Sequence, residues 1–196
     1  MDWYICSVEI GKEDNVRESI ANNKTLNDIS CIVPKRIVPE KKGGEHIQVT
    51  KLIFPGYIFI KTTMNFSKYH QICQEKHIIK MLGYNGRGLV QKINNLYVLE
   101  NSCFVSKIND TEFQDSFFQK IPNEEMIQLF KLLNENQEIN FSHISVNDKK
   151  IVFEKGPLKG LENLVKKIDL HKKRAKVCLH LLGIDVLFDV GIRFFQ

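Results

Sequence analysis

The sequence has few of the features that mark secreted, membrane-spanning or disulfide-rich proteins. Its 196 residues include five cysteines, an odd number, at scattered positions without any Cys-x-x-Cys pair. This pattern argues against a disulfide framework and favours free thiols in a reducing compartment. No apolar run approaches the ~18–20 residues of a membrane span, and the first residues lack the charged-then-apolar pattern of a signal peptide. We therefore expect a cytoplasmic protein that has no membrane partner.

Motifs of common catalytic, cofactor and metal sites are also missing. The chain has no Gly-x-Gly-x-x-Gly, P-loop or Gly-x-Ser-x-Gly motif, and the glycine-dense segment 83–88 lacks the Lys-Ser/Thr of a nucleotide-binding loop. Cys73 and His77 lie one helical turn apart, but no second pair of metal ligands follows them. The acidic residues form no pair typical of general acid–base catalysis. We expect neither an enzyme nor a bound cofactor or metal ion.

The charge of the chain is concentrated near its C-terminal end. Residues 1–145 carry 17 Lys/Arg and 17 Asp/Glu, whereas residues 146–196 carry 11 basic and 6 acidic residues and supply the whole net charge of +5. A basic C-terminal region indicates a polyanionic partner such as nucleic acid. A solvated basic surface without a partner is the alternative, and charge alone does not separate the two.

Apolar periodicity in the N-terminal part predicts strands and helices in alternation. Strands are predicted at 3–8, 29–38, 47–51, 53–60 and 78–82, and helices at 15–21 and 66–72. The run 53–60 is the most apolar, so we expect it to be the central strand. The Lys-Lys-Gly-Gly sequence at 41–44 predicts a hairpin tip, since glycine permits positive φ angles. The resulting order is typical of an α+β fold, in which an antiparallel sheet has helices packed on it.

The C-terminal part predicts a separate small β domain. Short strands are predicted at 151–154, 163–169, 174–182, 185–190 and 192–195. Five short strands of this kind are typical of a small β-barrel. A polar, Asn-rich segment precedes them, and a helix is predicted to begin after Pro122. We therefore predict an N-terminal domain at 1–134 with an insertion of mixed pattern around 89–120, a linker at 135–145 and a barrel at 146–196.

Cations cluster around two predicted turns of the C-terminal domain. The Gly-Pro-Leu-Lys-Gly sequence at 156–160 predicts one turn, and a hairpin tip is predicted around 171–174. If both turns lie at one end of the barrel, their cations would form a patch that phosphates can contact. Ordinary solvated turns are the alternative. The candidate nucleic-acid-binding residues are Lys155, Lys159, Lys166, Lys167, Lys172, Lys173, Arg174 and Lys176.

Aromatic residues mark the predicted central strand. Strand periodicity places Tyr57 and Phe59 on one face and Phe54 on the other. Such residues usually belong to the core, and we expect this of at least two of the three. An exposed aromatic patch on the sheet would instead indicate a protein interface.

Taken in order, these motifs resemble the NusG family of transcription elongation factors. The resemblance is carried by Trp-Tyr-Ile at 3–5 with Gly-Lys-Glu at 11–13, Val-Pro at 33–34, Leu-Ile-Phe-Pro-Gly-Tyr-Ile-Phe-Ile at 52–60, the segment 122–126 and the block 156–183. It covers nearly the whole chain except for about 89–120. It implies an N-terminal α+β domain that binds the RNA polymerase clamp, a flexible linker and a KOW barrel of the SH3-like type.

The resemblance also implies roles for individual residues. The polymerase-binding residues would be Phe54, Tyr57, Phe59 and Tyr4. Apart from the resemblance, Lys12 and Arg17, with Lys35 and Arg36, could contact non-template DNA, and an ordinary solvated surface is the alternative. A factor that bridges the clamp would suppress pausing and termination, and we expect it to act as a monomer. Two departures stand out, since Asn163 replaces a frequent Gly and Ile184 replaces the Arg that often follows Leu/Phe-Gly.

Because of these departures and the basic barrel, the chain looks like a specialised antiterminator of the LoaP type whose barrel binds a nascent RNA hairpin. A ribosome- or translation-linked RNA-binding protein is the alternative, because KOW barrels also occur in ribosomal proteins. The apolar residues Ile184, Val186, Leu187 and Phe188 would further permit the C-terminal segment to dock on the N-terminal domain in a helical form.

Overall fold

The structure, a computed structural model, describes residues 1–83, 89–93, 96–99, 117–147 and 150–195. The chain divides into two compact units, each built from two separate stretches of sequence. Unit 1 comprises Met1–Cys31 and Gly56–Ile121, and unit 2 comprises Ile32–Pro55 and Pro122–Gln196. Among the helices that the structure describes, none is long and apolar enough to cross a membrane.

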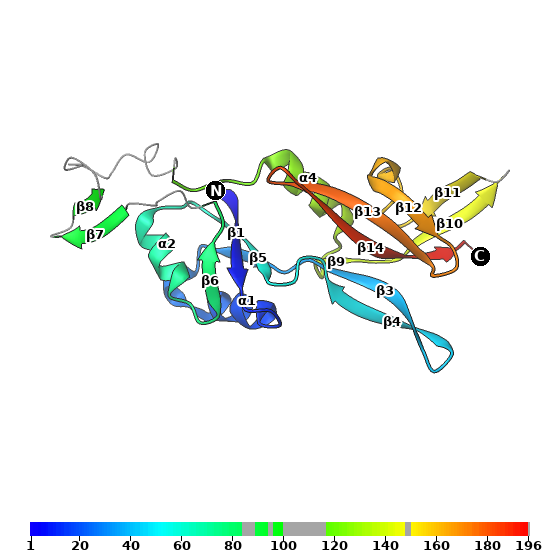
Figure 1. The fold of residues 1–196 in the computed structure, drawn as a ribbon, viewed down its shortest axis with the longest axis horizontal. Coiled ribbons are helices and arrows are strands. Elements are labelled where there is room, and N and C mark those ends of the chain that lie inside the picture. The colour runs from blue at the N-terminus through cyan, green and yellow to red at the C-terminus, as the bar shows by residue number, and fades with distance from the viewer. Residues whose placement is uncertain (84–88, 94–95, 100–116, 148–149, 196) are drawn as a thin grey trace. The chain divides into compact units, whose positions relative to one another are not determined.

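Unit 1 is built on a four-stranded sheet (Figure 1). The order across the sheet is β2 (Ser30–Ile32), β5 (Tyr57–Thr62), β1 (Asp2–Val8) and β6 (Ile78–Met81). β1 pairs antiparallel with both of its neighbours, so that Tyr4 lies opposite Ile60. The run of β-branched and aromatic residues in β1 and β5 suits a pleated, buried surface. The predicted antiparallel sheet is confirmed, and β5 lies inside it as expected. It begins at Tyr57 and not at the predicted Ile53, because residues 53–56 form a turn.

Two helices pack on this sheet through the faces that the sequence predicts. α1 (Glu13–Asn22) buries Val16 and Ile20, which lie one turn apart. α2 (Phe66–Cys73) begins at Asn65, whose side-chain oxygen accepts a hydrogen bond from the Lys68 amide at 2.8 Å. A short 3-10 helix, η1 (Lys24–Leu26), follows α1. The predicted α+β fold class is therefore confirmed.

The segment predicted as an insertion forms a second, smaller sheet where the structure describes it. β7 (Leu89–Ile93) and β8 (Leu96–Leu99) pair antiparallel. Residues 100–116 of the predicted insertion lie outside the described residues. The chain then returns to the main sheet, where the Ile121 amide donates to the Trp3 carbonyl at 2.8 Å.

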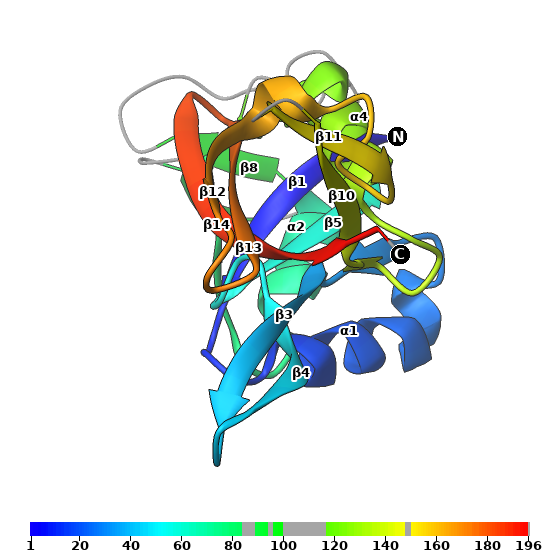
Figure 2. The same cartoon turned by 90° about the vertical axis from the view of Figure 1, so that its right-hand side faces the viewer.

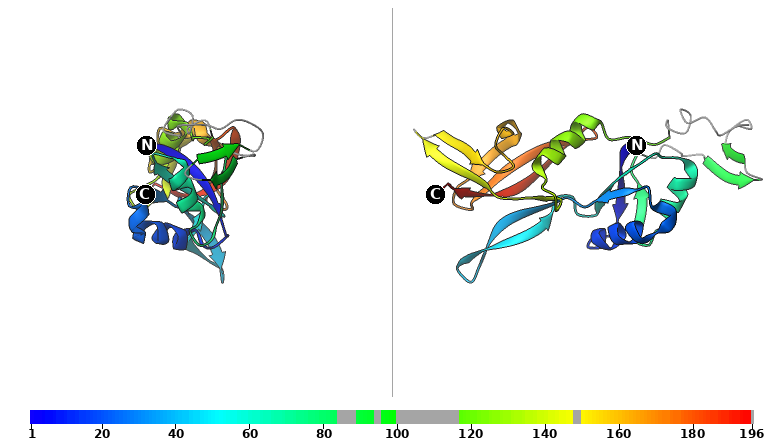
Figure 3. Two further views of the ribbon diagram at one scale, coloured as in Figure 1. Left: turned by 90° about the vertical axis from the view of Figure 1, so that its left-hand side faces the viewer. Right: turned by 180° about the vertical axis from the view of Figure 1, so that it is seen from behind.

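Unit 2 contains a long β-hairpin, visible as a two-stranded ribbon in Figure 3. β3 (Lys35–Lys42) and β4 (Glu45–Leu52) pair antiparallel, and β9 (Glu138–Ile139) adds a short parallel strand to β3. Gly43 and Gly44 form the tip with φ angles of 60° and 92°, as the sequence predicts. The predicted strand 29–38 is instead two strands, because Pro34 separates β2 from β3 and has no amide hydrogen to pair.

A five-stranded sheet makes up the rest of unit 2, together with α4 (Asn123–Leu132) and the 3-10 helix η2 (Glu162–Leu164). The order across the sheet is β11 (Lys150–Lys155), β10 (Ser142–Asn147), β14 (Ile184–Phe194), β13 (Arg174–Leu181) and β12 (Val165–Asp169). Figure 2 shows these strands curling around one another as a half-barrel. The small five-stranded β domain is thus confirmed, and the alternative helical form of its residues stays a prediction.

The details of this sheet differ from the prediction in two places. The predicted strands 185–190 and 192–195 are one continuous strand, β14. The fifth strand is β10, whose first four residues lie in the predicted linker 135–145, and β9 lies there as well. The sequence did not predict these strands because the stretch 135–145 is mostly polar. Its buried residues are only Ile139, Ser142 and Ile144. The domain boundaries 1–134, 135–145 and 146–196 stay a prediction.

Candidate functional sites

The Phe-Pro-Gly-Tyr motif at 54–57 forms a tight turn that is held by a buried carboxylate. Gly56 has a φ angle of 82°, which favours glycine. Its amide donates to Oε1 of Glu13 at 2.7 Å, and its carbonyl accepts from the Val8 amide at 2.8 Å. Only 2% of Glu13 is exposed. The first turn of α1 thereby fixes the point where β5 begins, and with it Tyr57.

The candidate polymerase-binding residues differ in exposure. Tyr57 is 39% exposed at the first position of β5. Tyr4 and Phe59 are buried, and strand pairing sets Phe59 opposite Ile5 inside unit 1. Phe54 belongs to unit 2 and is half-buried. Tyr4 and Phe59 therefore support the sheet from within. The expectation that at least two of Phe54, Tyr57 and Phe59 belong to the core is wrong, because Phe59 alone of these three is buried and Tyr57 is exposed.

Two of the candidate DNA contacts lie at the start of α1, whereas Lys35 and Arg36 are half-buried at the start of β3. Lys12 is exposed immediately before the helix. Arg17 forms an ion pair with Asp14 at 3.1 Å. Neither residue belongs to a larger cluster of cations on the helix, since the last turn of α1 holds no basic residue. Their contact with DNA stays a prediction.

One group of C-terminal cations surrounds a hollow of about 140 Å³ on β12 and β13. Lys167, Lys172 and Lys176 are exposed there. Asp169 and Asp189 also line the hollow. The backbone amide of Lys172 donates to Asp169 at 2.8 Å and lowers the pKa of that carboxyl group. The lysines outnumber the acids around the hollow, so a polyanion meets a net positive surface.

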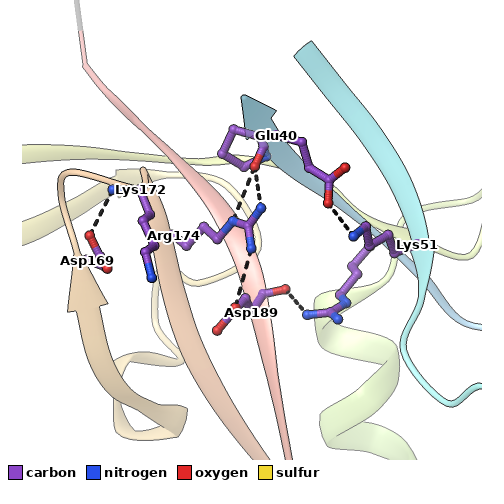
Figure 4. A network of polar contacts seen from close by, with 8 residues as sticks. Glu40, Lys51, Asp169, Lys172, Arg174 and Asp189 are labelled. Carbon is purple, nitrogen blue, oxygen red and sulfur yellow. Dashed lines mark hydrogen bonds and ion pairs between the residues drawn. The ribbon is translucent and has the colours of Figure 1, made fainter. Parts of the chain in front are cut away.

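Arg174 lines the same hollow but is occupied by contacts within unit 2 (Figure 4). Its guanidinium donates to the Pro39 carbonyl at 2.6 and 3.2 Å and lies 3.7 Å from the Asp189 carboxylate. Arg36 donates to the Asp189 carbonyl from the other side, and burial lowers the pKa of its guanidinium. Arg174 therefore ties the β3–β4 hairpin to the five-stranded sheet, a role that the sequence did not predict.

The Gly-Pro turn at 156–160 forms as predicted. Gly156 has a φ angle of 105°, and a Cβ atom there would lie 2.7 Å from the Phe141 carbonyl oxygen. Behind it, the Leu158 amide donates to the buried Ser142 hydroxyl at 3.0 Å. Lys159 points its ammonium group to the Glu154 carbonyl at 2.9 Å. The turn thus needs glycine, and its position is fixed by β10.

A second group of cations lines a groove that lies between the two predicted turns. Lys155 and Lys173 line one groove of about 540 Å³, together with His143, Arg193, Phe194 and Phe195. The prediction that both turns share one end holds for this pair of lysines. Lys159 and Lys166 are exposed but line neither this groove nor the hollow on β12 and β13 in the described part of the chain. The sequence analysis missed His143, Arg193 and the two phenylalanines, because strand pairing alone brings them to the lysines.

Comparison with known proteins identifies the family. A family model described as "Transcription termination factor nusG" matches residues 1–98, which is half of the chain. The chain belongs to the NusG family. Members of this family are transcription termination/antitermination factors and not known enzymes, and the predicted resemblance to NusG is confirmed.

Relatives match this NusG-family chain over most of its length. The "Transcription termination/antitermination protein NusG" of Buchnera aphidicola is 27% identical over 196 residues, covering 97% of this chain and 93% of the relative. The protein of the same description from Rickettsia typhi is 24% identical, covering 92% and 82%. A solved structure titled "Domain interaction in Thermotoga maritima NusG" aligns with a TM-score of 0.47 and 18% identity, over 97% of this chain and 93% of that one.

Proposed function

We propose that this NusG-family protein is a processive antitermination and elongation factor. It joins the RNA polymerase clamp through its N-terminal region and binds nucleic acid, a nascent RNA hairpin, through its basic C-terminal sheet, and so suppresses pausing and termination. The exposed lysines on β12 and β13 carry the nucleic-acid half of this proposal. The basic sheet and Ile184 after Gly183 favour a specialised paralogue of the LoaP type that acts on selected operons.

The polymerase half of the proposal depends on Tyr57. An aromatic ring that is 39% exposed at the end of a rigid central strand suits an anchor in a protein interface. The Glu13–Gly56 hydrogen bond fixes the backbone next to it, so little ordering is needed on binding.

A Tyr57→Ala variant of the full chain should bind polymerase about 30-fold or more weakly, since buried aromatic anchors contribute ~2 kcal/mol or more. Pull-down with core polymerase measures the loss, and in vitro transcription across a terminator measures antitermination. Ile79→Ala is the matched control, because Ile79 is exposed on β6 of the same unit. Unchanged antitermination by Tyr57→Ala would remove the proposed contact.

The nucleic-acid half is tested with Lys167, Lys172 and Lys176. Arg174 is left intact, because its contacts to Pro39 and Asp189 are internal. The triple alanine variant should bind RNA more weakly. The slope of log K against log salt concentration should become shallower by about 0.7–0.9 for each lost phosphate contact. The control is Lys24→Ala/Lys76→Ala/Lys80→Ala, which removes three exposed charges from unit 1. Equal binding by the two triple variants would refute a role for this surface.

A ribosome-linked RNA-binding protein is the competing function. The same basic surface on β12 and β13 would serve it, because ribosomal RNA presents the same phosphates. Sedimentation of lysates separates the two: the antitermination proposal requires the protein to travel with polymerase, and co-sedimentation with ribosomal subunits alone would favour the competitor.

A further inference from the structure

The groove that joins the two turns has an ordered row of side chains across three strands. Strand pairing places His143 of β10 opposite Lys155 of β11 on one side and opposite Arg193 of β14 on the other. Neighbouring strands lie ~4.8 Å apart, and paired residues point to the same face of a sheet. Lys155, His143 and Arg193 therefore stand side by side at this edge of unit 2.

Lys173 completes the row from a different turn. It has a φ angle of 52°, and its carbonyl accepts from the Ile192 amide at 3.0 Å. This hydrogen bond holds the β12–β13 hairpin tip next to the end of β14. Three cations thus line the groove, and none of its described lining residues is acidic. Such a surface has a net positive charge without internal neutralisation, unlike the hollow on β12 and β13.

Two aromatic rings accompany these cations. Phe194 and Phe195 are 52% and 56% exposed, although phenylalanine is usually buried. Strand periodicity places Phe195 on the same face as Arg193, and the Phe195 amide donates to the Ile144 carbonyl at 2.7 Å. The His143 ring meets the Phe195 ring edge-on, with centroids 6.4 Å apart. Phe195 is thereby held in place beside the row of cations.

Arg193 is also held by an aromatic neighbour. Its guanidinium lies 4.1 Å from the centre of the Phe141 ring. Phe141 packs against Gly191, where a Cβ atom would lie 2.5 Å from the ring. The glycine therefore lets Phe141 sit close to β14 and support Arg193. The guanidinium is positioned before any ligand arrives, so less side-chain conformational entropy is lost on binding.

We propose that this groove binds an unpaired stretch of RNA, with a base stacked on Phe195 and the adjoining phosphates on Lys155, Lys173 and Arg193. Aromatic rings beside a track of cations are the combination by which proteins hold single strands. A volume of about 540 Å³ suits a ligand of nucleotide size. The inference rests on the proposed function and refines it: the stem of a hairpin meets the lysines of β12 and β13, and its unpaired flank or loop enters this groove.

The test uses the full chain and a single-stranded RNA of ten nucleotides that carries 2-aminopurine, whose fluorescence is quenched by stacking. Wild-type protein should quench the probe. Phe195→Leu keeps an apolar side chain but no ring, and it should bind the single strand about 5- to 150-fold more weakly, the range for loss of one stacked base. Phe195→Trp should restore both binding and quenching. Phe130→Leu, a change at an exposed aromatic of α4, should have no effect.

The outcomes separate the inference from the proposed function. If wild-type protein bound neither single strands nor hairpins, both would be refuted. If it bound hairpins through Lys167, Lys172 and Lys176 while Phe195→Leu bound single strands normally, the inference alone would be refuted. Equal weakening of duplex and single-strand binding by Phe195→Leu would also overturn it, because bases inside a duplex already stack on their neighbours and leave no face for a side chain. Circular dichroism confirms that each variant is folded.

Discussion

At the residue scale, a buried carboxylate organises the turn before the central strand. The Glu13 side chain accepts a hydrogen bond from the Gly56 amide at 2.7 Å. Because Glu13 is buried, water cannot take its place as the acceptor. Glu13→Ala leaves that amide without its partner, and we expect a loss of about 1–3 kcal/mol in the free energy of unfolding. Urea denaturation measures it. Glu18→Ala, at an exposed position of the same helix, should change stability by less than about 0.5 kcal/mol.

A second prediction at this scale concerns the thiols. Burial raises the pKa of Cys31 to about 12 and also raises the pKa of Cys6 well above its ordinary value. Since the thiolate is the reactive form, both residues should resist iodoacetamide at pH 8 in the folded protein. Mass spectrometry of peptides measures the labelling, and labelling in guanidinium chloride is the control. Rapid alkylation of Cys6 under native conditions would contradict the burial of β1.

At the element scale, glycines in the same turn make unequal contributions. A Cβ atom at Gly156 would lie 2.7 Å from the backbone of Phe141 and Ser142, whereas one at Gly160 would meet nothing within 4 Å. Both residues have positive φ angles, so each alanine variant carries a backbone strain of about 1–2 kcal/mol. Gly156→Ala must also separate β10 from the turn. We expect its melting temperature to fall clearly below that of Gly160→Ala, and equal values would refute the tight packing.

The ion pair between Asp28 and Lys68 links α2 to the segment after η1. A hydrogen bond from Lys68 lowers the pKa of Asp28. A lowered pKa means that the pair stabilises the fold above the unfolded value of about 3.9 and that this stabilisation is lost as the pH falls through the folded value. Asp28→Asn should therefore lower the melting temperature slightly at pH 7, and this difference should shrink as the pH falls below about 3.9. The effect is at most about 1 kcal/mol, because the carboxylate is partly exposed.

Most elements follow from local patterns, and the exceptions have specific causes. β1, β5 and the helix faces of Val16 and Ile20 were predictable, because alternation and helical spacing are local properties of the sequence. β9 and β10 were not, since the surrounding sequence is polar and each has a partner strand, β3 or β14, that lies far along the chain. The groove of Lys155, His143 and Arg193 depends on the register of three strands, so no local pattern reveals it. The difference in exposure between Tyr57 and Phe59 likewise could not be predicted, because it depends on Tyr57 being the first residue of β5.

At the scale of the whole molecule, unit 2 is assembled from segments that are distant in the sequence. Arg174 on β13 donates a hydrogen bond to the Pro39 carbonyl on β3, and Arg36 on β3 donates one to the Asp189 carbonyl on β14. We expect Arg174→Gln to increase amide hydrogen exchange in the β3–β4 hairpin and in β14, because both lose a shared contact. Lys176→Gln, an exposed neighbour on the same strand, is the control. Unaltered exchange in the hairpin would show that Arg174 does not hold it.

The parallel pairing of β10 with β14 has a consequence for biosynthesis. Ser142 lies opposite Ile192, so the ribosome must make the whole intervening chain before β10 gains this neighbour. Until then β10 has only β11 beside it, and its other edge can recruit strands from foreign chains. Unit 2 therefore completes its sheet only late during translation, and until then the open edge of β10 exposes the nascent chain to aggregation.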